Sequence, residues 1–350
     1  MPRSPKSPRC IYPGSHATNR PILDVLANLA NEPCASFYLD TIAGMGNPAS
    51  AEGEDHHQGI ARTHKLSDDS VYWFLSHSET DDEDQGSISV YRYEGGLDIE
   101  HVEQIDPLTV AKLQQTVLLR EKHPSDICFL PDVDNLDAGY LFVTQEYTQH
   151  NLTVFRWNRK NGLSHVGDFP HGFPENGPNF VFIDRVGNDY FLGVASYHWG
   201  WLALFSAPAA ELFPECREGG IHLGAFKPTT PGPMFPFPLA LSNSPSQGKL
   251  VRDSVGAWYY LAFRGDADGD PRSDDFVDVY GVSFYPFMIT PLLHSVHVTF
   301  NPGDTGFVNT GTHYVEPGGR LLLSSSYRWA EDEGPEDSGY VSRIDECASN

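Results

Sequence analysis

Polar side chains that could transfer protons stand at the beginnings of five short β-like runs. They are His57 and Gln58, His123 with Ser125 and Asp126, Asn179, Gln247 with Lys249, and Thr312 with His313. Imidazole and carboxyl groups act as acids or bases near neutral pH, while amides and hydroxyls orient a substrate by hydrogen bonds. Buried polar groups must pair with one another, with water or with a ligand. A ligand site and a water-filled channel are therefore two interpretations of the same residues.

Aromatic side chains concentrate in loops after some of these runs. They are Tyr147, Tyr197, His198, Trp199, Trp201, Phe235, Phe237 and Trp329. Gly200 interrupts the strand pattern between two tryptophans, and prolines flank Phe237, which favours exposed loops over packing between strands. Acidic loops at 79–84, 266–275 and 331–337 are expected on the other side of the same opening. An aromatic wall facing a polar one predicts a pocket for a largely apolar small molecule.

Residue type suggests a role for each candidate. The catalytic or polarising candidates are His123, Asp126, His313, Arg264 and Arg328, and the substrate-binding candidates are His57, Gln58, Tyr147, Asn179, Tyr197, His198, Trp199, Trp201, Phe235, Phe237 and Trp329. Histidines from three separate runs could also hold a metal ion, but the only adjacent pair is His56-His57. The acidic stretch at 266–270 has its glycine in the wrong place for a calcium loop. We predict no metal ion and no cofactor.

A repeated strand pattern indicates how these residues come together. Five pairs of β-rich runs share one pattern: 71–76 with 87–93, 139–144 with 152–157, 189–194 with 201–205, 258–263 with 277–282, and 320–325 with 339–344. A shorter run precedes each pair, at 58–63, 125–130, 179–184, 249–253 and 312–316. Another run follows the first four pairs, at 99–105, 164–169, 221–226 and 295–300. Five four-stranded units predict an all-β, five-bladed β-propeller whose inner strands surround a channel.

The fifth unit lacks an outer strand, and the segment 34–41 near the N-terminus can supply it. If this segment pairs antiparallel with 339–344, Cys34 and Cys347 become neighbours close to disulfide reach. Apolar spacing predicts helices over 21–31 and 107–119. The expected organisation is an N-terminal arm with a short helix over 1–33 and a single propeller domain over 34–350.

Charge and cysteine usage limit the partners and the compartment. The chain has 47 acidic against 23 basic side chains, which disfavours nucleic acid or an anionic membrane as a partner. Met1–His16 lacks the apolar segment of a secretory signal, and the apolar runs are too short to span a bilayer. Five cysteines without a CxxC pair suggest neither a zinc ribbon nor a disulfide framework. We therefore expect reduced thiols and a soluble, cytoplasmic monomer.

Several enzyme classes lack their motifs in this sequence. There is no Gly-x-Ser-x-Gly elbow, no phosphate-binding glycine loop and no dinucleotide fingerprint, which disfavours serine hydrolases, kinases and nicotinamide enzymes. Lys249 to Phe263, around Trp258-Tyr259-Tyr260, resembles the blades of five-bladed glycoside hydrolases. That resemblance implies carboxylates on three inner strands, but His57 and Asn179 stand where two of them are needed. Glu146 or Glu175 could compensate.

An aromatic mouth, channel histidines and the missing hydrolase signature resemble, in general character, the propeller-type Diels–Alderase and hetero-Diels–Alderase cyclases of fungal secondary metabolism. The resemblance implies a cofactor-independent cyclase or pericyclase, a lyase or isomerase in broader terms, that folds an apolar substrate into a reactive conformation. We expect this activity, with a glycoside hydrolase-like or glycan-binding propeller as the alternative. The dissimilar blade loops favour an enzyme over a lectin with repeated pockets.

Overall fold

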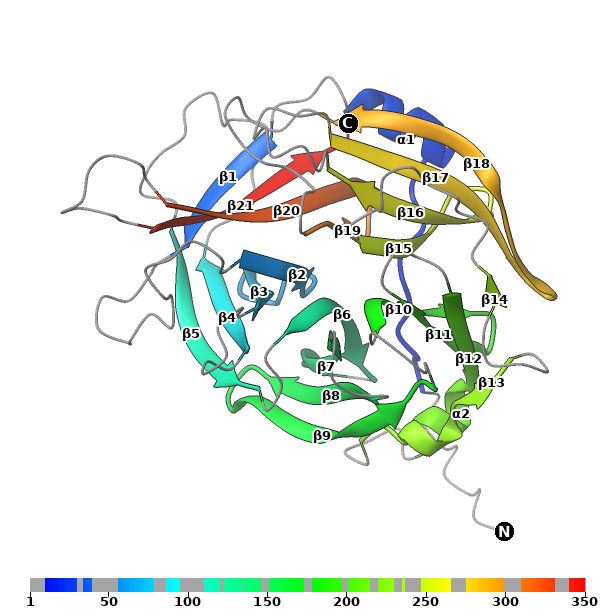
Figure 1. Cartoon of the computed structure of the whole chain (residues 1–350), viewed down its shortest axis with the longest axis horizontal. Helices are drawn as coiled ribbons and strands as arrows, with labels where there is room; N and C mark the ends of the chain where they lie inside the picture. Colours follow the sequence, from blue (N-terminus) through cyan, green and yellow to red (C-terminus); the bar gives the residue numbers. More distant parts are fainter. Residues whose placement is uncertain are drawn as a thin grey trace, which may run out of the picture.

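The computed structural model shows five antiparallel sheets arranged radially, with strands β2, β6, β10, β15 and β19 innermost (Figure 1). The structure describes residues 10–29, 34–39, 56–78, 86–94, 110–119, 123–133, 135–145, 151–172, 178–196, 201–214, 220–229, 235–236, 247–265, 275–298, 310–330 and 340–349. The predicted five-bladed β-propeller is confirmed. No helix in these ranges is long and apolar enough to cross a membrane.

The blades follow one another along the chain. Blade one contains β2 (His56–Arg62), β3 (Ser70–Ser78), β4 (Ser87–Glu94) and β5 (Val110–Leu118), and blade two contains β6 (Pro124–Asp132), β7 (Asn135–Gln145), β8 (Asn151–Asn158) and β9 (Gly162–Pro170). Blade three contains β10 (Pro178–Val186), β11 (Asp189–Ser196), β12 (Trp201–Pro208) and β13 (Lys227–Pro228), with β14 (Phe235–Pro236) beside β12. Blade four contains β15 (Gln247–Arg252), β16 (Trp258–Arg264), β17 (Asp275–Phe284) and β18 (Phe287–Val298). Blade five contains β19 (Thr312–Val315), β20 (Leu321–Ala330) and β21 (Tyr340–Ala348).

An N-terminal strand completes the fifth blade, as the sequence predicts. Strand β1 (Cys34–Leu39) pairs antiparallel with β21, and Cys34 lies opposite Cys347 in the register. The same strand pairs in parallel with β5 through Tyr38 and Val110. The outer strands of blades five and one are therefore hydrogen-bonded, which removes two free sheet edges at the point where the ring closes.

Two predicted elements differ from the structure. The helix expected over 107–119 is wrong, because Val110–Leu118 forms strand β5 against β4. Exposure alternates from Gln114 to Val117, so pairing with a neighbouring strand overrides the apolar spacing that favoured a helix. The outer strand expected over 221–226 contains the 3-10 helix η3 (Leu223–Ala225), and only the short β13 pairs there. The outer strand expected over 99–105 lies outside the described residues.

Apolar side chains fill the spaces between neighbouring blades. The described core forms five clusters, and each joins two adjacent blades, for example blades one and two around Phe74 and Trp157. Helix α1 (Ile22–Leu29) buries Ile22, Val25 and Leu26 in the cluster of blades four and five. Such contacts pack each sheet like a core layer of an ordinary domain.

Close approach of inner strands explains one glycine. A Cβ atom at Gly59 in β2 would lie 2.5 Å from the carbonyl oxygen of Ser125 and 2.9 Å from the backbone nitrogen of Ile127 in β6. Since these are backbone atoms of the next blade, any larger residue forces the two blades apart. Gly59 thus sets the tight contact of blades one and two at the channel.

The cysteines depart from the expectation of reduced thiols. Cys10 takes part in a disulfide bond, and so does Cys347, whereas Cys128 is a free thiol. Cys347 is fully buried in the cluster of blades four and five, and the register predicts Cys34 as its partner. Cys10 lies just before the segment that reaches the channel.

Counting thiols tests this arrangement. The unreduced protein, unfolded in guanidinium with iodoacetamide, is expected to gain at most three carbamidomethyl groups, because Cys10 and Cys347 are disulfide-bonded, and the reduced protein is expected to gain five. Intact mass spectrometry measures both values. Five groups without reductant would contradict the disulfides.

Candidate functional site

The inner strands run in the same direction along the channel, which therefore has two distinct ends. We call the end where β2, β6, β10, β15 and β19 begin the upper mouth, and the space near their other ends the lower pocket. Turns between first and second strands, such as His64–Lys65 in blade one, border the lower pocket.

Polar side chains surround the upper mouth. Gln58 Nε2 lies 3.5 Å from His123 Nε2, which joins blades one and two. The Gln247 amide donates to the Gln58 carbonyl and accepts a 2.8 Å hydrogen bond from the Gly311 backbone, which links blades one, four and five. The rings of His57 and His77 meet edge to face, 6.0 Å apart.

A buried ion pair lies just below this mouth. Lys249 Nζ of blade four contacts Asp126 Oδ2 of blade two at 2.5 Å and the carbonyl oxygens of Ile127 and Val181 at 3.0 Å. The carboxylate also accepts hydrogen bonds from the backbone nitrogens of Ile127 and Val181. Burial raises the pKa of Asp126 to about 6, although Lys249 acts in the opposite direction. These contacts occupy the carboxylate that the sequence suggests as an acid or base.

The predicted polar ring is therefore divided between levels of the channel. His57, Gln58, His123 and Asn179 lie at the upper mouth, whereas His313 lines the lower pocket. Burial lowers the pKa of His313 to about 3, with a further contribution from Lys249, so the imidazole is neutral near pH 7. Whether these residues perform catalysis stays a prediction.

Some of the other predicted site residues lie within the described ranges, and some lie outside them. Arg264 pairs with Asp278 at 3.2 Å and lies over the Phe276 ring within blade four. Arg328 and Trp329 lie in β20, Trp201 begins β12 and Phe235 begins β14. For these four residues the structure describes the backbone position only. Pairing of β14 with β12 places Phe235 opposite Leu202, next to Trp201. Tyr147, Tyr197, His198, Trp199 and Phe237 lie outside the described residues.

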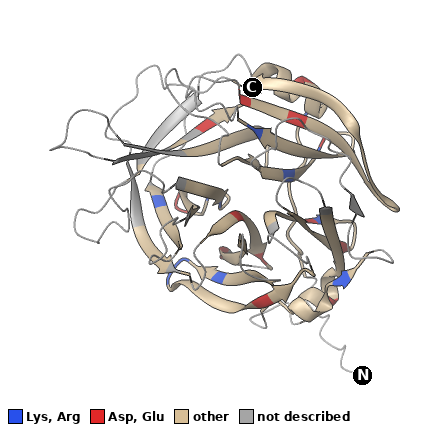
Figure 2. Cartoon of the chain, viewed as in Figure 1, with Lys and Arg blue, Asp and Glu red and all other residues tan. Residues whose placement is uncertain are grey.

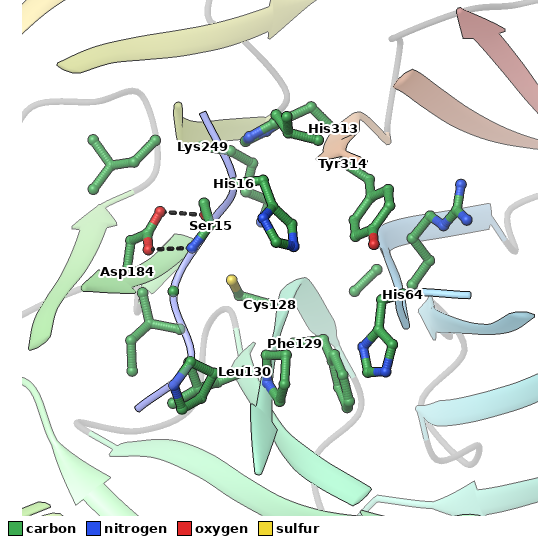
Figure 3. Close-up of a pocket in the computed structure, with 18 of the residues that line it drawn as sticks. Ser15, His16, His64, Cys128, Phe129, Leu130, Asp184, Lys249, His313 and Tyr314 are labelled. Carbon is green, nitrogen blue, oxygen red and sulfur yellow. Dashed lines mark hydrogen bonds between the residues drawn. The ribbon is translucent and has the colours of Figure 1, made fainter. Parts of the chain in front are cut away.

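The lower pocket is a cavity of about 730 Å³ that all five inner strands and the N-terminal segment 11–16 enclose. Figure 3 shows Tyr314 and His64 on one side, Ser15 and Asp184 on the other, and His16 and Cys128 between them. Ser15 donates from its backbone nitrogen to Asp184 Oδ1 at 3.0 Å and from its hydroxyl to Oδ2. No motif in the sequence marks segment 11–16 as part of a site.

The described residues form no metal-binding group and no single cluster of cations. Within the described ranges, no three His, Cys, Asp or Glu side chains are grouped so that they could hold a metal ion. Lys and Arg occupy separate places around the ring (Figure 2).

Comparison with known proteins finds similar structures but no matching sequence family. No protein-family model and no curated protein sequence matches the chain. Among solved structures, a family 117 glycoside hydrolase of the marine bacterium Zobellia galactanivorans is 13% identical, with 91% of each chain covered and a TM-score of 0.47. An alpha-L-arabinanase of Penicillium chrysogenum is 10% identical over 91% of this chain and 98% of that chain, with a TM-score of 0.43. A mannose phosphorylase of Leishmania mexicana is 10% identical over 93% and 92%, with a TM-score of 0.46.

These comparisons correct the predicted activity. The similar structures are named as carbohydrate-active enzymes, and none of the three is a cyclase. The interpretation as a Diels–Alder-type cyclase, lyase or isomerase of secondary metabolism is therefore wrong. It relied on general character without a diagnostic motif, and the propeller fold that carried the resemblance is common to many activities.

Removing Lys249 tests the ion pair. Lys249→Met should lower the free energy of unfolding by about 3–5 kcal/mol, because it leaves the Asp126 carboxylate buried without a counter-ion. Guanidinium denaturation followed by tryptophan fluorescence measures the change. The double variant Asp126→Leu/Lys249→Met should recover much of the loss, since neither charge remains. Lys65→Met, which removes the exposed pair with Asp69, is the matched control and should cost at most about 1 kcal/mol.

The lowered pKa of His313 predicts that the folded protein loses stability in acid. Its pKa is about 3 in the folded chain and near the ordinary value of 6.5 in the unfolded chain, so the unfolded state binds the proton first as the pH falls. The neutral imidazole makes its full contribution to the free energy of unfolding above pH 6.5. This contribution decreases by about 1.4 kcal/mol per pH unit from there towards pH 3. His313→Gln should reduce the difference in free energy of unfolding between pH 7 and pH 5. An unchanged difference would count against this assignment.

Proposed function

We propose that this chain is a carbohydrate-binding five-bladed propeller that holds its ligand at the upper mouth. The supporting observation is the group of hydrogen-bonding side chains there, Gln58, His123 and Asn179, which three consecutive blades contribute. A sugar presents hydroxyl groups that both donate and accept. An amide or a neutral imidazole carries a donor and an acceptor in one side chain, so each can bind such a hydroxyl.

Binding fits the described residues better than hydrolysis. Cleavage of a glycosidic bond requires two carboxyl groups about 5–10 Å apart. Among the described residues at the beginnings of the inner strands, Asp126 is the only carboxylate, and Lys249 together with two backbone amides occupies it. Glu146 and Glu175, which could complete a catalytic pair, lie outside the described residues.

The predicted compartment is part of the proposal. The expected monomer stays a prediction, whereas the expected cytoplasmic location conflicts with the disulfide bonds. The disulfide-bonded Cys10 and Cys347 oppose a reducing compartment, because structural disulfides persist mainly in oxidising surroundings. We therefore propose that the chain functions in an oxidising compartment.

Titration with defined sugars tests the proposed function. The full chain is expected to bind at least one of a set of arabinan, xylan, galactan and mannan oligosaccharides in isothermal titration calorimetry. The double variant Gln58→Leu/Asn179→Leu should weaken that binding about 30-fold, because two hydrogen bonds of about 1 kcal/mol each are lost. Asn161→Leu removes an amide from an exposed turn between β8 and β9 and should leave the affinity unchanged.

A reducing-end assay on the same oligosaccharides separates binding from hydrolysis. Binding without product supports the proposal, and steady release of reducing ends would replace it with a glycosidase. No heat of binding with any of the four classes would overturn it.

A further inference from the structure

The lower pocket offers a second site, independent of the sugar proposal. Its volume of about 730 Å³ lies within the range of about 300–1,000 Å³ typical of small-molecule sites. It lies in the channel on the far side of the Asp126–Lys249 ion pair from the upper mouth. A ligand there need not compete with one at the mouth.

Most of the pocket wall is apolar. The residues that give it this character include Ile11, Phe129, Leu130, Phe182, Leu250 and Val315. Four of the five blades and the N-terminal segment each contribute to this set. Contact with such a wall stabilises a bound molecule in proportion to the apolar area that it removes from water.

The charged groups of the pocket already have partners. Arg62 forms a 2.5 Å ion pair with Glu346, Lys249 pairs with Asp126, and Asp132 pairs with Arg156. Lys65 pairs with Asp69, and the Asp184 carboxylate accepts from Ser15. An anionic ligand would meet only lysine and arginine side chains that already have carboxylate partners, and the Asp184 carboxylate is already hydrogen-bonded, so the geometry favours an uncharged ligand.

Two neutral polar groups remain for hydrogen bonding. His313 Nδ1 and the Tyr314 hydroxyl have no hydrogen-bond partner among the described residues. The imidazole is neutral for the reason given above, and burial raises the pKa of Tyr314 to about 12, so its hydroxyl also stays protonated. They are successive residues of β19 and therefore point to opposite faces of blade five, His313 towards Lys249 of blade four and Tyr314 towards Arg62 of blade one, so they offer an acceptor and a donor at separate places on the pocket wall.

The N-terminal segment forms a wall that is tied down along its length. The Tyr12 carbonyl accepts from Arg185 at 2.6 Å, the Pro13 carbonyl accepts from Tyr190 at 2.6 Å, and Ser15 is bound to Asp184. Beyond them, Ala17 forms a bridge with Arg252. These bonds hold the segment in place across blades three and four, so the pocket is formed before any ligand arrives.

From these observations we propose that the lower pocket binds an uncharged, largely apolar small molecule that carries a hydroxyl or carbonyl group, with such a group facing His313 or Tyr314. The apolar wall supplies affinity and the two polar groups fix orientation.

Nile red, an uncharged apolar dye, is the probe for the pocket. The full chain should bind one dye molecule with increased fluorescence. Cys128→Phe, which fills the space that the thiol faces, should weaken binding at least about tenfold, and circular dichroism checks that the variant folds. Ile11→Glu places a charge at the pocket and should act similarly without any change in the core, because Ile11 is 76% exposed. Val255→Glu, at a residue 78% exposed and outside the pocket lining, is the matched control and should bind like the wild type.

A surface site for the dye must be separated from the pocket. Tyr285, Met288, Leu292 and Leu293 expose apolar side chains at and next to strand β18. Leu292→Ser/Leu293→Ser should leave Nile red binding unchanged. Loss of binding in this variant, equal binding in Ile11→Glu and Val255→Glu, or no binding to the wild type would each overturn the proposal.

The polar groups are tested with a matched pair of ligands. 2-Naphthol should displace Nile red about five- to tenfold better than 2-methylnaphthalene, because the hydroxyl replaces a methyl group of similar size and gains a hydrogen bond. Tyr314→Phe combined with His313→Leu should remove this preference while dye binding persists. A preference that survives the double variant would contradict the assigned roles.

Discussion

The ammonium group of Lys249 is the contact on which the centre of this propeller depends. Its three hydrogen atoms are directed to the Asp126 carboxylate and to the carbonyls of Ile127 and Val181, so one side chain of blade four connects the inner strands of blades two and three. Inner strands in a propeller have few side chains with which to contact one another across the channel. A charge that is desolvated there must have every donor satisfied, and this requirement fixes the relative height of three blades.

The same ion pair gives the channel two unlike ends. Above it, amides and imidazoles of Gln58, His123 and Gln247 link one another and leave polar groups near the mouth. Below it, the wall becomes apolar, with His313 and Tyr314 as neutral exceptions. Two chemically different compartments thus lie on either side of one buried pair near the middle of five strands.

How far the sequence predicts this molecule depends on the range of the contacts involved. Dense β-branched and aromatic runs such as 71–75 and 140–143 identify the middle strands, because a continuous apolar run indicates burial on both faces. Outer strands are harder, and Val110–Leu118 has a spacing that fits a helix until β4 pairs with it. The sequence identifies the polar positions of the inner strands, but it does not predict how far below the upper mouth each one lies. Lys249 and His313 lie only a few residues along their strands, yet the register places them beneath the mouth rather than at it.

The N-terminal segment shows why the remaining part of the site has no signal in the sequence. Ser15 meets Asp184 across 169 residues, and no local periodicity reports a contact of that separation. Yet the segment leads directly into α1, which packs on blades four and five, and then towards β1, which pairs with β21 and β5. The N-terminal residues that line the lower pocket therefore belong to the same part of the chain that closes the ring. Because β1 pairs with β21 near the C-terminus, this pairing needs the whole chain. Ring closure and completion of the pocket wall thus both depend on the N-terminal arm docking on blades that follow it in sequence.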